Sequence, residues 1–366
     1  MSSYVGRHDD RITTRKEPAV GLIRHTATDP PAPRQTGPAV WRGADLARTP
    51  ERWTWALDAH EVDELVAAVD AFDGPLEMLT ADRFPLPGLG PRLTALRHEL
   101  THGLGFRLVS GLPCHQLTER QAAAAFVGLG AHLGSARSQN ARGELLGHVR
   151  NIGLDVADPN VRIYQTDRRQ TFHTDSTDVV GLLCLETAAR GGASMLASAS
   201  TIYNEMLDRR PDLAAVLFRP IATDRRGEVP AGADPYFTIP VLSWHDQALT
   251  VLYQRQYIES AQRFDDVPPL AGDVTAALDL FDEIANEPDI HLEMQLAVGD
   301  MQFVHNHTLL HDRTAFVDKP GSPRHLLRLW LSVPGDRTLP PVFAQRYGSI
   351  EVGNRGGIVV GERDQF

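Results

Sequence analysis

The chain has 366 residues, of which 42% are hydrophobic and 23% are charged, a mixture typical of a globular protein with one large core or two domains. Acidic residues outnumber basic ones by 47 to 36, so the net charge is −11 and nucleic acid or an anionic membrane surface is a poor partner. The two cysteines are far apart, which predicts a reduced protein without a disulfide framework. The sequence has no apolar stretch near the ~20 residues of a membrane span and no apolar leader, so we expect a cytoplasmic protein.

Residues 1–50 are the first predicted segment, an N-terminal arm that is extended or partly disordered. Its sequence mixes charged and small residues with four prolines, namely Pro30, Pro31, Pro33 and Pro38. Such a composition favours neither a helix nor a strand. Trp41, Trp53 and Trp55 predict that the end of the arm packs on the body of the protein.

An α-rich part is expected next. Apolar residues recur at helical spacing over 62–69, 93–100 and 122–133, with a short strand at 106–109 between the last two. Thr118 and Gln121 form a capping-box pattern in front of the third helix.

From residue 145 the pattern changes to short strand-like runs separated by turn residues. The run at 179–185 is apolar without alternation, which predicts a strand buried on both faces. Residues 292–298 alternate strictly, which predicts a half-buried strand. A hairpin is expected where 239–244 and 249–253 flank three turn residues, and a helix at 274–284 interrupts the strands. The many strands predict a sandwich or barrel with helices packed outside.

One stretch, residues 170–176, carries a chemical signal. In an extended segment His173 and Asp175 share one face, because a strand repeats every two residues. Two histidines and one carboxylate on one side of a metal ion are typical of non-haem Fe(II) oxygenases, although a lone His-x-Asp is more often a surface pair. The second histidine is not decided by spacing, since His305, His307 and His311 share strand parity.

Four segments appear together in a recognisable order. They are Phe172–Asp175, Arg190–Ser194, His311–Phe316 and Arg324–Trp330. In this order and spacing the chain resembles the taurine dioxygenase and clavaminate synthase-like family of Fe(II)/2-oxoglutarate-dependent oxygenases, from roughly Gly103 to Pro334. The resemblance implies an α+β, mainly β fold, a double-stranded β-helix (jelly roll) with flanking helices and an irregular N-terminal arm. We expect the oxygenase domain over 51–350 and a C-terminal tail at 351–366.

The resemblance also implies a role for individual residues. His173, Asp175 and His311 would hold Fe(II), and the family signature that follows His311 selects it over His305 and His307. The co-substrate 2-oxoglutarate would bind through its far carboxylate to Arg324, a guanidinium suited to two parallel hydrogen bonds. Ser194 stands where the family usually has a threonine that bonds the same carboxylate. The reaction would consume O2 and couple oxidative decarboxylation of 2-oxoglutarate to substrate oxidation.

The substrate is expected to be a small molecule, anionic or amino-acid-like, with Arg328 binding it where related enzymes place a substrate arginine. Asp175 argues against halogenation, because related halogenases lack this carboxylate ligand. Hydroxylation, desaturation and ring closure all remain open, as do the oligomeric state and the role of the arm. His305 and His307 either face the substrate or are hydrogen-bonded structural residues.

Two other functions were weighed against oxygenation. A non-catalytic jelly-roll module that binds a metal or a small acid is compatible with the composition. A zinc hydrolase fits less well, because it leaves Arg324 and Ser194 without a role and offers no general base beside the three metal ligands.

Overall fold

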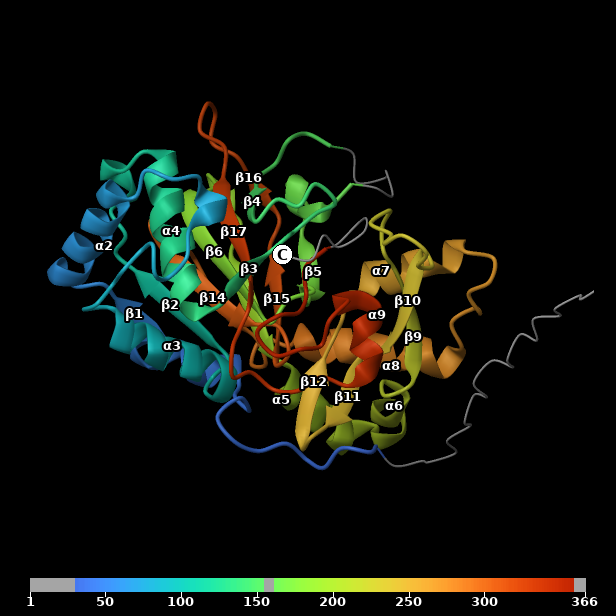
Figure 1. Cartoon of the computed structure of the whole chain (residues 1–366). Coiled ribbons are helices and arrows are strands. Elements are labelled where there is room, and N and C mark those ends of the chain that lie inside the picture. The colour runs from blue at the N-terminus through green and yellow to red at the C-terminus, as the bar shows by residue number, and fades with distance from the viewer. Residues whose placement is uncertain (1–29, 155–160, 359–366) are drawn as a thin grey trace, which may run out of the picture.

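The computed structural model describes residues 30–154 and 161–358. Within them the chain forms two main sheets with helices on both outer sides, so that four layers lie one behind another (Figure 1). The helices α2, α3 and α4 cover the larger sheet, and α5, α6 and α8 cover the smaller one. None of the described helices combines the length and apolar character that crossing a bilayer requires.

The larger sheet has seven strands in the order β1-β2-β14-β6-β17-β3, with β4 also paired to β17. These strands are β1 (Thr54–Ala56), β2 (Phe106–Ser110), β3 (Ser135–Arg137), β4 (Leu146–Val149), β6 (Val179–Glu186), β14 (Met301–His305) and β17 (His325–Ser332). The smaller sheet has the order β13-β8-β15-β5. Its strands are β5 (Gln170–His173), β8 (Ser194–Ser198), β13 (Leu292–Met294) and β15 (Leu309–Arg313).

Three two-stranded sheets lie outside these layers. They pair β9 (Pro220–Asp224) with β10 (Tyr236–Pro240), β11 (Leu242–His245) with β12 (Ala248–Val251), and β7 (Arg190–Gly191) with β16 (Phe316–Val317). The α-helices are α1 (Gly43–Ala47), α2 (Ala59–Ala71), α3 (Gly90–His102), α4 (Glu119–Leu133), α5 (Ala199–Arg209), α6 (Pro211–Val216), α7 (Arg255–Ser260), α8 (Gly272–Ala285) and α9 (Ala344–Tyr347). Short 3₁₀ helices are η1 (Pro50–Arg52), η2 (Leu76–Met78), η3 (Cys114–Gln116), η4 (Ile163–Gln165), η5 (Ala261–Arg263) and η6 (Pro341–Phe343).

Most elements expected from the sequence are present. Thr118 caps α4 through the backbone N–H of Gln121, whose side chain reaches back in turn, so the predicted capping box is confirmed. The hairpin of β11 and β12 is confirmed, and Trp41, Trp53 and Trp55 are all buried as expected. Residues 1–29 of the predicted arm lie outside the described residues.

The expected strand over 292–298 is wrong in its length. The strand β13 ends at Met294, and Val298 is 45% exposed. The alternation of apolar residues continues past the point where the backbone has a neighbouring strand, since the partner β8 pairs only with Leu292, Glu293 and Met294. A period of two in the sequence thus shows neither where strand pairing ends nor that every apolar residue in the pattern is buried.

The parity of the strands decides which side chains enter the space between the two sheets. On β17, Leu327, Leu329 and Leu331 pack against the helices α2 to α4. Leu326 and Trp330 point the other way, into the core between the sheets, and a strand places Arg328 on the same side as these two. A cationic residue therefore lies in the inter-sheet layer among apolar neighbours.

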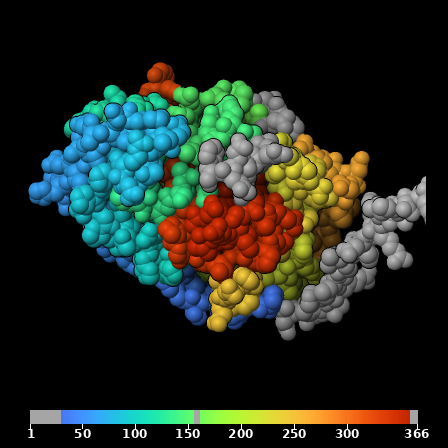
Figure 2. Space-filling model, viewed as in Figure 1, coloured from blue at the N-terminus to red at the C-terminus, as the bar shows by residue number. Residues whose placement is uncertain are grey.

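The C-terminal segment returns to the middle of the fold and covers the centre of one face (Figure 2). Its anchor is Arg355, which is 1% exposed and bonds Asp178 Oδ1 at 2.6 Å and Asp336 Oδ2 at 3.0 Å. The backbone N–H groups of Gly357 and Ile358 then donate to carbonyls of the core. One buried cation thus holds two buried carboxylates and the end of the described chain together.

Replacing Arg355 with methionine should destabilise the protein strongly, because it leaves both carboxylates buried without their cation. Breaking a buried ion pair by removing one partner typically costs about 3–5 kcal/mol. We expect that loss in the free energy of unfolding, measured by urea denaturation. The exposed Arg190 is the matched control, and Arg190→Met should change stability by less than about 0.5 kcal/mol. Equal stability of the two variants would contradict this account of the anchor.

Candidate metal centre

Three potential metal ligands converge between the two sheets. The donor atoms of His173, Asp175 and His311 all lie within 4.8 Å of one another. Nε2 of His173 is 4.0 Å from Asp175 Oδ1, and Nε2 of His311 is 3.8 Å from Asp175 Oδ2. The two imidazole rings have centroids 4.1 Å apart. Two nitrogen donors and one carboxylate on one side of a common point are the donor set of a facial triad.

The smaller sheet places the two histidines side by side. His173 and His311 are direct partners in the antiparallel pairing of β5 and β15, so both side chains stand on one face. Asp175 follows the end of β5, in the connection that leaves the smaller sheet for β6 of the larger one. Its backbone N–H donates to Asn306 Oδ1 at 3.0 Å, in the neighbouring connection from β14 to β15.

Hydrogen bonds orient two of the three ligands, whereas Nδ1 of His311 has no hydrogen-bond partner among the described residues. Nδ1 of His173 lies 2.8 Å from the carbonyl oxygen of Thr171, so it carries the proton and leaves the Nε2 lone pair toward the centre. The amide nitrogen of Gln170 lies 2.8 Å from that Nε2. The indole N–H of Trp330 donates to Asp175 Oδ2 at 2.8 Å. Partners of this kind fix the orientation of metal ligands.

The electrostatic environment keeps these groups in the forms that bind a metal. Burial, together with the neighbouring His173, lowers the pKa of His311 to about 3. Burial also lowers the pKa of His173. For Asp175, burial favours the acid, but Arg328 and the two imidazoles outweigh it and lower the pKa of the carboxyl group. Neutral imidazoles beside an ionised carboxylate are ready to coordinate a divalent cation.

Two further groups of potential ligands are less suitable. His305 bonds Asp336 and Thr308, and His307 bonds Asp178 at 2.8 Å. Arg355 already pairs with both of these carboxylates, and in the described part of the chain neither His305 nor His307 lines a pocket beside the three ligands. The third group, Glu119 with His148 and His325, lies on the surface.

An inner pocket adjoins the three ligands and contains a buried cation without a counter-ion. Arg324 lines this pocket together with Ser194 and His311. Within the described residues its Nη1 has no hydrogen-bond partner, and its Nη2 reaches only the carbonyl oxygen of Gly192 at 3.4 Å. Burial lowers the pKa of Arg324 to about 10. A buried guanidinium in this state requires an anionic partner, and a ligand carboxylate would supply one.

The turn at Gly191 and Gly192 makes room for Arg324. At Gly192 φ is +74°, and a Cβ there would lie 2.9 Å from Arg324 Nε. A side chain at this position would therefore push the guanidinium away from its place. Ser194 follows on β8, where its hydroxyl donates to Gln302 Oε1 at 2.9 Å. The structure thus brings Ser194 and Arg324 to one pocket, as the sequence predicts.

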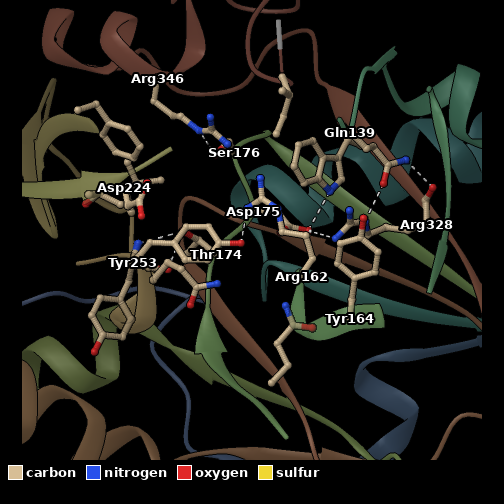
Figure 3. A pocket seen from close by; sticks show the side chains of 18 residues that line it. Gln139, Arg162, Tyr164, Thr174, Asp175, Ser176, Asp224, Tyr253, Arg328 and Arg346 are labelled. Carbon is tan, nitrogen blue, oxygen red and sulfur yellow. Dashed lines mark hydrogen bonds and ion pairs between the residues drawn. The ribbon is translucent and has the colours of Figure 1, made fainter. Parts of the chain in front are cut away.

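An outer pocket of about 700 Å³, open solvent at its mouth included, meets the inner one at Asp175 and Arg328. Figure 3 shows Arg328 reaching toward Asp175, whose Oδ2 is 3.6 Å from Arg328 Nη1. The Nε of Arg328 donates to Gln139 at 2.6 Å, and its guanidinium lies over Tyr164 at 4.6 Å from the ring centroid.

Sequence reasoning did not identify several residues of the outer pocket. They include Gln139, Arg162, Tyr257 and Arg346. These residues come from loops and short helices with no motif around them, and only the folded chain brings them together. The hydrogen bond from Trp330 to Asp175 had a usable signal, because Trp330 shares strand parity with Arg328.

The comparisons with known proteins agree with this arrangement. The model described as "Taurine catabolism dioxygenase TauD, TfdA family" matches residues 72–330. The chain is 33% identical over 316 residues to the FR-33289 synthase of Streptomyces rubellomurinus, a match that covers 83% of this chain and 92% of that protein. It is 31% identical over 294 residues to the taurine hydroxylase-like protein SAT17 of Stachybotrys chartarum, covering 76% of this chain and 75% of that protein.

The fold is also similar to a solved structure. Asparagine oxygenase, in complex with Fe(II), 2S,3S-3-hydroxyasparagine and succinate, superposes with a TM-score of 0.60 at 17% sequence identity. The match covers 85% of this chain and 100% of the asparagine oxygenase chain.

If His173, Asp175 and His311 form one centre, His173→Ala or His311→Ala should weaken Fe(II) binding at least about 100-fold, more than the 10- to 100-fold typical of losing an outer partner of a ligand. Anaerobic isothermal titration with Fe(II) measures this directly. The control is His148→Ala, which removes an exposed imidazole from the surface group and should leave the tight site intact. Retention of tight binding in both buried variants would exclude the centre.

Proposed function

The chain belongs to the TauD, TfdA family of taurine catabolism dioxygenases, and from that membership we propose a role for each residue of the site. The protein is a 2-oxoglutarate-dependent non-haem iron dioxygenase whose cofactors are Fe(II), 2-oxoglutarate and O2. This reaction class displaces the alternative of a non-catalytic binding module. The observation that supports the assignments best is the convergence of three metal ligands at one pocket with Arg324, whose Nη1 has no hydrogen-bond partner among the described residues.

His173, Asp175 and His311 hold the iron in this proposal. Their neutral imidazoles and ionised carboxylate match the donor set, and Trp330 and Thr171 keep two of them oriented. The bound metal, 2-oxoglutarate and O2 together supply the oxidising chemistry. The protein contributes placement and a partly buried pocket, and its own side chains exclude water from the face between the sheets.

Arg324 binds the far carboxylate of 2-oxoglutarate, and Ser194 lines the same end of the inner pocket. This assignment gives the buried guanidinium the counter-ion that the described residues do not provide. The Ser194 hydroxyl can turn from Gln302 to the carboxylate, because a hydroxyl hydrogen rotates freely between acceptors.

The finer description of the fold is also part of the proposal. The two main sheets form a jelly roll over an oxygenase domain at 51–350, with an arm at 1–50 and a tail at 351–366. The tail packs on the domain through Arg355. We place the protein in the cytoplasm, which agrees with two unpaired cysteines.

The outer pocket binds a small anionic or amino-acid-like substrate, with Arg328 as one contact. The similar structure of asparagine oxygenase holds a hydroxylated amino acid, which agrees with a substrate of this kind. Hydroxylation is the reaction that we favour among the oxidations that this chemistry allows. Arg328 lies between the pocket and Asp175, so it can hold an anionic group of the substrate next to the iron.

Substrate-independent consumption of 2-oxoglutarate should depend on the three ligands. We expect His173→Ala and Asp175→Ala to reduce succinate formation, measured with Fe(II), ascorbate and O2 but without a primary substrate, to the background. His148→Ala serves as the control with wild-type turnover. Wild-type rates in both ligand variants would reject the metal assignment.

Arg324→Gln should raise the KM for 2-oxoglutarate by about 10- to 150-fold, because a hydrogen bond to a charged group contributes about 1.5–3 kcal/mol. Arg190→Gln removes an exposed arginine from the neighbouring turn and should leave this KM unchanged. An unaltered KM in the Arg324 variant, at intact folding, would remove Arg324 from the co-substrate site.

A further inference from the structure

Arg346 lines the outer pocket together with two other arginines, Arg162 and Arg328. It belongs to α9, in the C-terminal segment that covers the centre of one face (Figure 2). Figure 3 shows its guanidinium directed toward Ser176 at the pocket wall. Both residues line the outer pocket, together with Asp175 and Arg328. A segment remote from the metal ligands in sequence thus contributes a charge to the substrate pocket.

The guanidinium of Arg346 is only partly satisfied. Its Nε donates to Ser176 Oγ at 2.8 Å, and its carbon lies 5.7 Å from the centroid of the Phe237 ring. Its two terminal nitrogens have no hydrogen-bond partner in the described part of the chain, and no carboxylate there lies within 4.0 Å of it. The Ser176 hydroxyl accepts from Arg346 and keeps its own hydrogen to donate.

Two of the charged residues that line the outer pocket, Arg162 and Asp224, already have partners of opposite charge, whereas Arg346 has none among the described residues. Arg162 is neutralised by Glu228, whose Oε2 lies 2.5 Å from Arg162 Nη2. The carboxylate of Asp224 is neutralised in the same way by Arg263, at 3.1 Å. These pairs cancel. Burial and the neighbouring Arg162 lower the pKa of Arg346, while Glu228, which is already paired with Arg162, raises it, so an anion beside Arg346 would stabilise its charged form.

The formal charges at the proposed iron site and in the outer pocket sum to two uncompensated positive charges. On the proposed function, the charges of Fe(II), Asp175, 2-oxoglutarate and Arg324 sum to zero. Arg328 and Arg346 then remain as two cations without a full counter-charge. A doubly negative substrate would neutralise both, whereas a single carboxylate would leave one cation uncompensated.

We propose that Arg346 and Ser176 form an anion subsite that binds a doubly charged tetrahedral oxyanion of the primary substrate, such as a phosphate monoester. The assignment rests on the proposed function, because the count of charges includes iron and 2-oxoglutarate. Two free guanidinium nitrogens and one hydroxyl are three donors, which suit an oxyanion with three terminal oxygens. The subsite lies apart from Arg328, so it selects which end of the substrate is presented to the iron.

The anchoring of the C-terminal segment supports this role. Arg355 lies nine residues after Arg346 and binds the buried carboxylates of Asp178 and Asp336, which fixes the chain there. The N–H of Gly357 bonds the carbonyl oxygen of Ser176 itself. Arg346 and Ser176 are therefore held in register by a main-chain contact, and the subsite is preorganised for its ligand.

Ethyl phosphate is the probe, because a phosphate monoester carries close to two negative charges at neutral pH. It is titrated calorimetrically, without oxygen, into protein saturated with Fe(II) and 2-oxoglutarate, so that Arg324 is already occupied. Ethanesulfonate and propionate, which carry one charge, are compared. The wild-type protein should bind ethyl phosphate at least ten times more tightly than either. Arg346→Gln should weaken ethyl phosphate binding by about 10- to 150-fold.

Further variants separate the subsite from a general loss of charge or folding. Arg346→Lys should recover part of the affinity, because the charge remains while the paired donors are lost. Ser176→Ala should weaken binding by a smaller factor, about 2- to 10-fold. Arg219→Gln makes the same charge change at an exposed ion pair and should bind ethyl phosphate like the wild type.

Equal affinity of the wild type and Arg346→Gln for ethyl phosphate, or no preference of the wild type for the doubly charged anion, would overturn the subsite. Admission of O2 to the same samples tests the proposed function separately. Succinate formed by the wild type without selective ethyl phosphate binding would reject the subsite alone. Absence of succinate with iron and 2-oxoglutarate bound would reject the proposed function.

Discussion

The hydrogen-bonded contact between two chain connections is the constraint on which the site depends. The connection after β5 runs from the smaller sheet to the larger one, and the connection after β14 runs from the larger sheet to the smaller one. The two meet where Asp175 N–H donates to Asn306 Oδ1. The N–H of Asn306 in turn donates to the carbonyl oxygen of Asp178. The bonded pair holds the carboxylate beside the two histidines, since His173 and His311 bracket these same connections.

The buried charges around Arg355 are paired, whereas within the described chain the buried guanidinium of Arg324 is not. Asp178 and Asp336 are matched by Arg355 and by two histidines, and every one of these side chains is buried. Arg324 has no such match among the described residues. Because an unpaired buried charge is costly, the contrast marks Arg324 as a binding residue, while the balanced group around Arg355 is part of the framework. Burial alone would not have separated the two.

The sequence predicted those parts of the fold and the site that depend on local pattern. Strand parity and the capping box of α4 could be read directly, and the distal motifs His311 and Arg324 were placed by resemblance to a family. The length of β13 could not be read, because pairing depends on the neighbouring β8. Nor could Arg346 or Gln139 be found, since no spacing rule connects a C-terminal helix to a loop some two hundred residues earlier. Contacts between distant segments require the folded chain.

The C-terminal segment joins the stability of the fold to the choice of substrate. Arg355 serves the core, whereas Arg346 on the same segment lines the outer pocket, so the contacts that anchor the segment also hold the proposed anion subsite in place. The two histidines of the proposed iron site lie on paired strands, so a change of register would separate them. The pocket wall, by contrast, includes Arg346 from a terminal segment that takes no part in the pairing of these strands. Such a division lets one oxidising centre serve different substrates, because the residues that select the substrate are separate from those that hold the metal.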